Sequence, residues 1–319
     1  MKIGLIDVDG HNYPNLPLMK ISAWHKSKGH MVEWYDAFAG LIEPYDKVYM
    51  SKVFSFTPDY EAPIYAKEIE KGGTGYCIET INGKEVFHKE KNKNLPNEIE
   101  HIYPDYSLYP EMTKDTAYGF LTRGCPRGCD FCIVKDKEGL CSHKVADLSE
   151  FWRGQRNIVL CDPNILACKE WEDLLQQLID SKAKVDFNQG LDIRMMTEKK
   201  AEMLSRIPIK SIHFAWDRIE DREMIEPKFL TFRKQSNVNP HDLQVYVLVG
   251  DRERKVRKED LYRIYWLRDN GFAPYVMIYD KYDLPHHHEL KKLQRYVNSR
   301  PIFWTIDNFD DYMKGENNG

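Results

Sequence analysis

The stretch that most constrains this chain runs from Gly124 to Cys132 and reads Gly-Cys-Pro-Arg-Gly-Cys-Asp-Phe-Cys. Its three thiols, Cys125, Cys129 and Cys132, lie in a Gly- and Pro-containing loop that follows a strand-like run at Ala117–Thr122. Such a loop can turn its sulfurs towards one point, and converging thiolates bind soft metals or iron–sulfur clusters. Three ligands leave one coordination position open, and an open position favours chemistry over a structural role.

This CxxxCxxC spacing, with Phe131 directly before the last cysteine, resembles the signature of the radical S-adenosylmethionine superfamily. The resemblance implies that the three cysteines hold a [4Fe-4S] cluster, that its free iron binds S-adenosylmethionine, and that Phe131 lies near the adenine. It further implies reductive cleavage of that cofactor, which starts hydrogen abstraction from an unidentified substrate. A reductant protein such as flavodoxin or ferredoxin is the expected partner.

A zinc knuckle is the alternative interpretation of the same thiols, with Cys141 or His143 as the fourth ligand. Zinc sites usually pair their cysteines as CxxC or CxxxxC, which this loop does not do. A non-catalytic binding protein, stabilised by zinc or by a cluster, therefore stays open as a second kind of function. Metal content separates the two, because zinc would contradict the enzyme hypothesis and iron would support it.

Composition limits the partners and the compartment. The seven cysteines are odd in number and fit a reducing cytoplasm better than a disulfide framework. No apolar run is long enough to span a bilayer, so we expect no membrane segment. The formal net charge of −4 gives no footprint for bulk nucleic-acid binding. Asp251 to Lys258 is the most basic window, read either as a contact for a phosphate-bearing substrate or as a solvated helix start.

The first part of the chain alternates between strand and helix patterns. Strands are expected at Lys2–Ile6, Met31–Tyr35 and Lys47–Ser51, with a fourth ending at Gly72-Gly73, and a helix at Leu16–Lys28. This order predicts a parallel sheet in a small flavodoxin- or Rossmann-like domain.

The opening domain is also similar to the cobalamin-binding domain that precedes the barrel in one class of the superfamily. Asp9-Gly10-His11 matches the start of its DxHxxG motif, while Pro14 stands where the Gly should be. If cobalamin binds, the resemblance implies a methyltransferase. The other interpretation is that Asp9 and His11 only turn the chain after a strand.

The second half predicts a partial barrel. In such folds the active site lies at the rim formed by the carboxyl ends of the strands. The six expected strands are Ala117–Thr122, Asn157–Cys161, Lys184–Asn188, Ser211–Ala215, Gln244–Val249 and Tyr275–Tyr279. Helices are expected at Trp171–Lys182, Glu198–Ser205 and Lys258–Asn270. The fold class is therefore α/β, with a six-stranded (βα)6 TIM-like partial barrel after the small domain. We divide the chain into this domain at 1–76, a linker at 77–114, the barrel at 115–285 and an extension at 286–319.

Polar residues at the strand ends are the candidate cofactor contacts. Under the resemblance, Asp162 and Asn164 lie where the family binds the methionine amino group, and Asn188 and Gln189 could hold ribose hydroxyls. Arg194 could contact the methionine carboxylate, and Asp217 is a polar group at the rim. Val247 to Gly250 resembles the family's GxIxG segment at the adenine, with Val247 in place of the first Gly. The competing interpretations are a helix cap at Asp162 or Asn164, an Arg194–Asp192 pair, and a strand end at Gly250.

Overall fold

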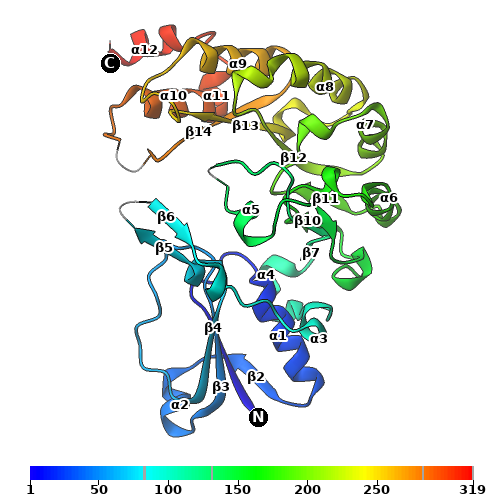
Figure 1. The fold of residues 1–319 in the computed structure, drawn as a ribbon, viewed down its shortest axis with the longest axis vertical. Coiled ribbons are helices and arrows are strands. Elements are labelled where there is room, and N and C mark those ends of the chain that lie inside the picture. The colour runs from blue at the N-terminus through cyan, green and yellow to red at the C-terminus, as the bar shows by residue number, and fades with distance from the viewer. Residues whose placement is uncertain (82–83, 131, 282–283, 318–319) are drawn as a thin grey trace. The chain divides into compact units, whose positions relative to one another are not determined.

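The structure is a computed structural model that describes residues 1–81, 84–130, 132–281 and 284–317. It shows a mixed α/β chain with a four-stranded sheet in the order β2-β1-β3-β4 and a six-stranded sheet in the order β14-β13-β12-β11-β10-β7 (Figure 1). The strand pairs of these two sheets run parallel. The predicted α/β class with two parallel sheets is thereby confirmed.

The elements follow one another in short alternation. The strands are β1 (Lys2–Asp7), β2 (Met31–Trp34), β3 (Tyr45–Ser51), β4 (Ala66–Gly72), β5 (Ile78–Ile81), β6 (Lys84–Phe87), β7 (Thr116–Gly119), β8 (Thr122–Arg123), β9 (His143–Lys144), β10 (Asn157–Leu160), β11 (Lys184–Phe187), β12 (Ile209–Ala215), β13 (Leu243–Val249) and β14 (Ala273–Ile278). The helices are α1 (Leu16–Ser27), α2 (Ala37–Ile42), α3 (Asn97–Glu100), α4 (Pro110–Thr113), α5 (Val134–Lys137), α6 (Trp171–Ser181), α7 (Glu198–Ser205), α8 (Arg222–Gln235), α9 (Lys258–Asp269), α10 (Glu289–Asn298), α11 (Arg300–Phe303) and α12 (Phe309–Asn317).

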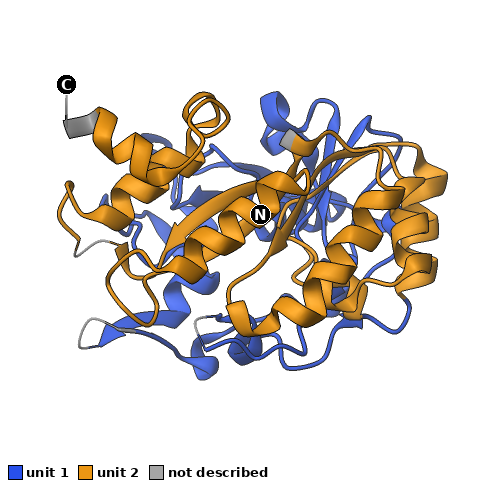
Figure 2. Cartoon of the chain, turned by 90° about the horizontal axis from the view of Figure 1, so that it is seen from above, with its two compact units in different colours: residues 1–161, 168–170 blue, residues 162–167, 171–319 orange. Residues whose placement is uncertain are grey.

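The chain divides into two compact units, coloured separately in Figure 2. Unit 1 holds residues 1–161 and 168–170, and unit 2 holds residues 162–167 and 171–319. Strands β1 to β10 belong to unit 1, and strands β11 to β14 belong to unit 2.

The four-stranded sheet of unit 1 forms where the apolar strand pattern predicts it. On helix α1, Leu18 and Met19 pack with Ile3 and Leu5 of β1 in one buried cluster. The Asn15 side chain accepts a hydrogen bond from the Leu18 amide at 3.3 Å, so it caps the start of α1. Apolar burial on this face joins the helix to the sheet.

Residues 77–114, predicted as a linker, carry their own structure in unit 1. Strands β5 and β6 pair antiparallel, and Asn82-Gly83, a dipeptide that predicts a hairpin turn between them, lies outside the described residues. Ile99, Leu108 and Tyr109 belong to the same buried cluster as β1 and α1. This stretch is therefore part of the core of unit 1 as well as a connection.

One predicted strand differs from the structure. Instead of a single strand at Ala117–Thr122, the chain forms β7 in the large sheet and then β8, which pairs antiparallel with β9 in a small hairpin. The other five predicted strands appear with bounds shifted by at most two residues, and α7 has the predicted bounds. The hairpin depends on pairing with residues twenty positions away, which a local pattern does not reveal.

In unit 2 the strands have two chemically different faces. Ile212 and Phe214 of β12 and Val245 and Val247 of β13 are almost fully buried, and Phe214 packs edge-on against Phe229 of α8. The alternate residues of the same strands are half-buried and include polar side chains. Alternation along a strand separates the two sets, so one face is core and the other is available for different chemistry.

A buried arginine joins the ends of two strands to helix α9. Arg263 is 1% exposed and donates hydrogen bonds to the Trp216 carbonyl at 2.7 Å and the Leu248 carbonyl at 2.9 Å. Its guanidinium also pairs with Asp260, whose side chain is fully buried, at 2.7 Å. A buried charge is tolerated only with such complete pairing, so Arg263 fixes α9 against the carboxyl ends of β12 and β13.

We therefore expect Arg263→Met to reduce the free energy of unfolding by roughly 3–5 kcal/mol, because Asp260 would lose its buried partner and keep only Arg257, and three buried carbonyls would lose their donor. Urea titration measures this change. The control is Arg252→Met, since Arg252 is half-exposed and pairs with Glu220 at 2.6 Å. Exposed pairs of this kind contribute about 0–1 kcal/mol. Equal losses in the two variants would contradict the role assigned to Arg263.

A second stability prediction concerns His25 of α1, which is 3% exposed. Its imidazole contacts His30 Nδ1 at 2.8 Å and the Tyr49 hydroxyl at 3.0 Å. Burial, together with the charges of His30 and Lys47, lowers the pKa of His25 to about 4. Because the unfolded chain binds the proton more readily, stability should fall as pH drops from about 6.5 to about 4, by at most about 3 kcal/mol.

Chemical denaturation at several pH values checks this dependence. His25→Gln should flatten the fall in stability between neutral pH and pH about 4. His286→Gln serves as the control, because His286 is exposed and lies in unit 2. A pH dependence that is the same in the wild type and in His25→Gln would show that another group is responsible.

Candidate functional site

The thiol loop of unit 1, residues 124–138, begins at a position that only glycine can occupy. Gly124 has φ +81°, and a Cβ atom placed there would lie 2.1 Å from the Cys141 carbonyl oxygen. The Cys125 amide then donates to the Gly139 carbonyl at 3.2 Å, and the Cys132 amide donates to the Cys129 carbonyl at 3.0 Å. The loop connects β8 to β9, and these two hydrogen bonds fold it back on itself.

Glu138 closes this loop from the far end. Its carboxylate accepts the Gly124 amide at 3.0 Å and pairs with the Arg123 guanidinium at 2.8 Å. The Glu138 side chain is only 11% exposed, which strengthens both interactions relative to water. Residues at the two ends of the loop are thus joined by a charge-assisted contact.

The three thiols have the chemistry of a soft-metal donor set. None of them forms a disulfide, and each is half-buried. Burial raises the pKa of the Cys132 thiol, and the nearby Cys125 and Glu138 raise it further. Metal binding would have to displace the proton from this thiol, as it does when a cation coordinates sulfur.

The described side chains do not form a finished metal site by themselves. Within the described ranges, no group of three or more His, Cys, Asp or Glu side chains is arranged to hold a metal ion. Phe131, the aromatic residue of the signature, lies outside the described residues. The donor chemistry and the loop closure fit a thiolate-bound cluster, while the complete ligand geometry is not present in the chain alone.

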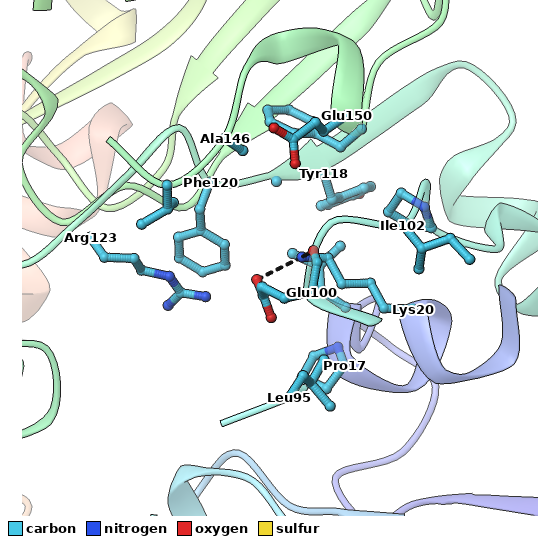
Figure 3. Close-up of a pocket in the computed structure, with 15 residues that line it drawn as sticks. Pro17, Lys20, Leu95, Glu100, Ile102, Tyr118, Phe120, Arg123, Ala146 and Glu150 are labelled. Carbon is cyan, nitrogen blue, oxygen red and sulfur yellow. Dashed lines mark hydrogen bonds and ion pairs between the residues drawn. The ribbon is translucent and has the colours of Figure 1, made fainter. Parts of the chain in front are cut away.

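A small cavity lies beside the start of the thiol loop (Figure 3). It has a volume of about 60 Å³ and is lined by the Lys20–Glu100 ion pair on one side and by Phe120 and Arg123 on the other. The Arg123 guanidinium stacks over the Phe120 ring at 3.3 Å. A water molecule needs about 10–15 Å³ of such volume, so this cavity has room for a few waters and is too small for a nucleoside.

Asp9 of the DxH match has a structural role in unit 1. Its carboxylate accepts the Val53 amide at 2.5 Å and the Thr57 hydroxyl at 2.7 Å, so it fixes the loop after β3. The His11 ring stacks on Trp34 with the centroids 4.1 Å apart. These contacts agree with the interpretation that the two residues organise a loop.

The candidates after β10 and β11 lie in unit 2. Asp162 and Asn164 follow β10 directly and are 4% and 1% exposed. The Ala167 amide donates to the Asn164 carbonyl at 3.2 Å, so Asn164 begins a short turn. Asn188 is half-buried and Gln189 is exposed in the turn that follows β11. All four therefore lie at the carboxyl ends of strands, as predicted.

Arg194 pairs with Asp192, as the competing interpretation expected. Its Nε atom lies 2.7 Å from Asp192 Oδ1, and one of its terminal nitrogens lies 3.2 Å from Asp221 Oδ2. Burial raises the pKa of Asp217, against the opposing charges of Arg263 and Arg194. Arg194 and Asp217 are thus brought into the same electrostatic environment at the end of β12.

Gly250 and the sequence His286-His287-His288 have local explanations. Gly250 has φ +78° at the end of β13, and a Cβ atom there would lie 2.8 Å from Leu290 Cδ1. His288, the last of the three histidines, caps α10 by accepting the Leu290 amide at 3.2 Å.

The basic window is neutralised by carboxylates of unit 2. Arg252 pairs with Glu220, Arg254 with Asp280, Lys255 with Glu253, and Arg257 with Asp260 and Asp251. Cations that are paired with carboxylates attract phosphate groups only weakly. The window therefore offers no support for a nucleic-acid interface.

One polar cluster was missed in the sequence analysis. It consists of Asp186 on β11, Ser211 and His213 on β12, and Tyr246 on β13, all on the sheet face opposite the core. The signal was available, because polar residues alternate with buried apolar ones in each of these strands. Alternation alone did not show that the four side chains would meet.

No model of a known protein family matches the chain, and no curated protein matches it in sequence. Among the described residues, no helix has both the length and the apolar character that crossing a bilayer requires.

Gly124 supplies the test of the loop geometry. We expect Gly124→Ala to lower the midpoint of thermal unfolding by about 4 °C or more, because left-handed strain and the clash with the Cys141 carbonyl add together. Gly154→Ala is the matched control, since Gly154 also has a positive φ of +95° but no atom within 4 Å of an added Cβ. Differential scanning calorimetry compares them, and an equal drop in both variants would exclude the clash as a cause.

Proposed function

We propose that this chain is a radical S-adenosylmethionine enzyme in which Cys125, Cys129 and Cys132 hold a [4Fe-4S] cluster with one open iron. The observation that carries the proposal is the thiol loop, where three disulfide-free cysteines share one glycine-shaped loop closed by Glu138. This loop follows β7 and β8 closely in the chain, at the carboxyl end of an outer strand of the six-stranded sheet.

The strand order of the large sheet supports the same proposal. Its strands β7, β10, β11, β12, β13 and β14 are neighbours in chain order, which is the order of a (βα)6 partial barrel. The barrel and the flavodoxin-like character of the first domain are part of the proposal. Loops at the carboxyl ends of such strands carry the reactive groups of enzymes built this way.

The residues of the chain have defined tasks in this proposal. Glu138 and Gly124 position the loop, and Cys132 gives up its proton when the cluster is loaded. When bound, the cluster and S-adenosylmethionine would supply a carbon radical that takes hydrogen from the substrate. Asp162, Asn164, Asn188 and Gln189 are the proposed polar contacts of the cofactor, whereas Arg194 is already shared by Asp192 and Asp221.

A zinc-stabilised binding protein is the second candidate, and one observation favours it. The Cys141 backbone lies directly against the start of the thiol loop, since a Cβ atom at Gly124 would lie 2.1 Å from the Cys141 carbonyl oxygen. Cys141 is therefore a better fourth ligand than His143, whose Nδ1 lies 3.1 Å from the Cys141 carbonyl. A site with four thiolates would be closed and structural.

Cobalamin is not part of the proposal. Asp9 is committed to the loop after β3, and His11 is stacked on Trp34. A cobalamin-dependent methyltransferase remains an outcome of the experiment below rather than a premise of it.

The test uses the full chain, purified without oxygen and reconstituted with iron and sulfide. After reduction with dithionite and addition of S-adenosylmethionine, we expect 5′-deoxyadenosine from the wild type and none above background from Cys129→Ala. Cys141→Ala is the matched control and should keep both the iron and the product, because an open iron needs only three cysteines.

Other outcomes separate the candidates. Zinc in the wild type, lost in both Cys129→Ala and Cys141→Ala, would establish the closed structural site and contradict the enzyme proposal. S-adenosylhomocysteine that forms only when cobalamin is added would establish methyl transfer.

A further inference from the structure

The second face of the unit 2 sheet carries a connected set of polar side chains. Asp186 is aligned with Ser211 in the strand register, and His213 is aligned with Gln244. The side chains of His213 and Asp186 are 14% and 19% exposed. Polar groups in the middle of strands lose hydration and give no apolar burial, so an inert sheet face would favour apolar residues there.

The donor and acceptor of each hydrogen bond in this cluster can be assigned, starting from the Asp186 carboxylate. The Ser211 hydroxyl donates to Asp186 Oδ1 at 2.7 Å, so its oxygen accepts from His213 Nε2 at 3.2 Å. His213 Nδ1 is then the acceptor for the Tyr246 hydroxyl at 3.2 Å. This assignment follows from the single proton on each hydroxyl and fixes the tautomer of His213.

From this arrangement, we infer that Asp186, Ser211, His213 and Tyr246 form a proton-accepting site for a small ligand that carries a hydroxyl group on a flat ring. The inference is independent of the thiol loop, because all four residues belong to unit 2. Tyr246 is the group that contacts the ligand, and His213 is the base behind it.

The proton transfer balances without any co-reactant. The ligand O–H bond breaks, and its proton passes to the Tyr246 oxygen while the phenolic proton of Tyr246 moves to His213 Nδ1. The ligand becomes an oxyanion and accepts a hydrogen bond from Tyr246. His213 becomes an imidazolium, which retains its Nε2 proton towards Ser211 and is balanced by the Asp186 carboxylate 3.8 Å away.

The surroundings of Tyr246 fit a flat ligand. The His213 and Tyr246 rings are parallel, with an interplanar angle of 5° and centroids 5.4 Å apart. Tyr275 meets Tyr246 edge-on at 5.8 Å, and Tyr275 and Met277 of β14 are 36% and 47% exposed. These side chains extend the polar cluster into an apolar aromatic shelf, against which a ring can stack.

The electrostatics agree with this geometry. Burial lowers the pKa of His213, so the imidazole is neutral near pH 7, while Asp186 and Gln244 oppose that shift and favour the protonated form. Burial also raises the pKa of Tyr246, with Tyr275 and Asp186 adding to it, so the phenol keeps its proton until one arrives from the ligand. The groups that interact with His213 and Tyr246 across the strands are therefore Asp186, Ser211, Gln244 and Tyr275.

The experiment measures the ionisation of 7-hydroxycoumarin bound to the full chain, by absorption over a range of pH. We expect the bound dye to ionise at a pH at least about one unit below the free dye, a tenfold change in the equilibrium. Asp186→Asn and Tyr246→Phe should remove this difference. The matched control Tyr279→Phe should keep it, because Tyr279 lies after β14 and is 44% exposed.

Two results would overturn the inference: a dye that does not bind the wild-type chain, or a bound dye whose ionisation is unchanged or is equally shifted in Tyr246→Phe. Circular dichroism of each variant shows whether it has folded. Cys129→Ala should behave like the wild type in this assay. A failure here is therefore distinct from a failure of the proposed radical chemistry, which the 5′-deoxyadenosine measurement decides.

Discussion

The rim of the unit 2 sheet depends on the buried charge of Arg263. Its guanidinium donates hydrogen bonds to the Trp216, Asp217 and Leu248 carbonyls and to the Asp260 carboxylate. Four acceptors around one cation fix where β12 and β13 end and where α9 begins. The backbone at Trp216, Asp217 and Leu248 therefore has a defined position, because a buried cation cannot lose a partner without a large penalty.

A half-buried charged side chain also organises the thiol loop of unit 1. Glu138 joins Arg123 to the Gly124 amide, and the left-handed Gly124 lets the backbone approach Cys141 closely. The three cysteines on this loop form no disulfide. That condition suits a metal site, in which the cation itself completes the geometry. It also explains why the zinc and the cluster hypotheses share most of their residues.

Most of the regular structure was predictable because it rests on local patterns. Helix α7 and the strands of the large sheet follow from apolar periodicity, which each segment carries within itself. The split between β7 and β8 was not predictable, because β8 exists only through its pairing with β9. Helix α8 has no counterpart among the predicted helices, and Pro227 within it is a residue that usually ends a helix.

The sequence by itself determined the α/β class and the three candidate thiols, since these are encoded by periodicity and spacing. Only the tertiary structure decided what the polar residues do. Asp9 fixes a loop, Arg194 is shared between two carboxylates, and Asp186, Ser211, His213 and Tyr246 meet on one sheet face. Partners of this kind come from different strands, so their distances are set by how the strands pair and not by any local pattern.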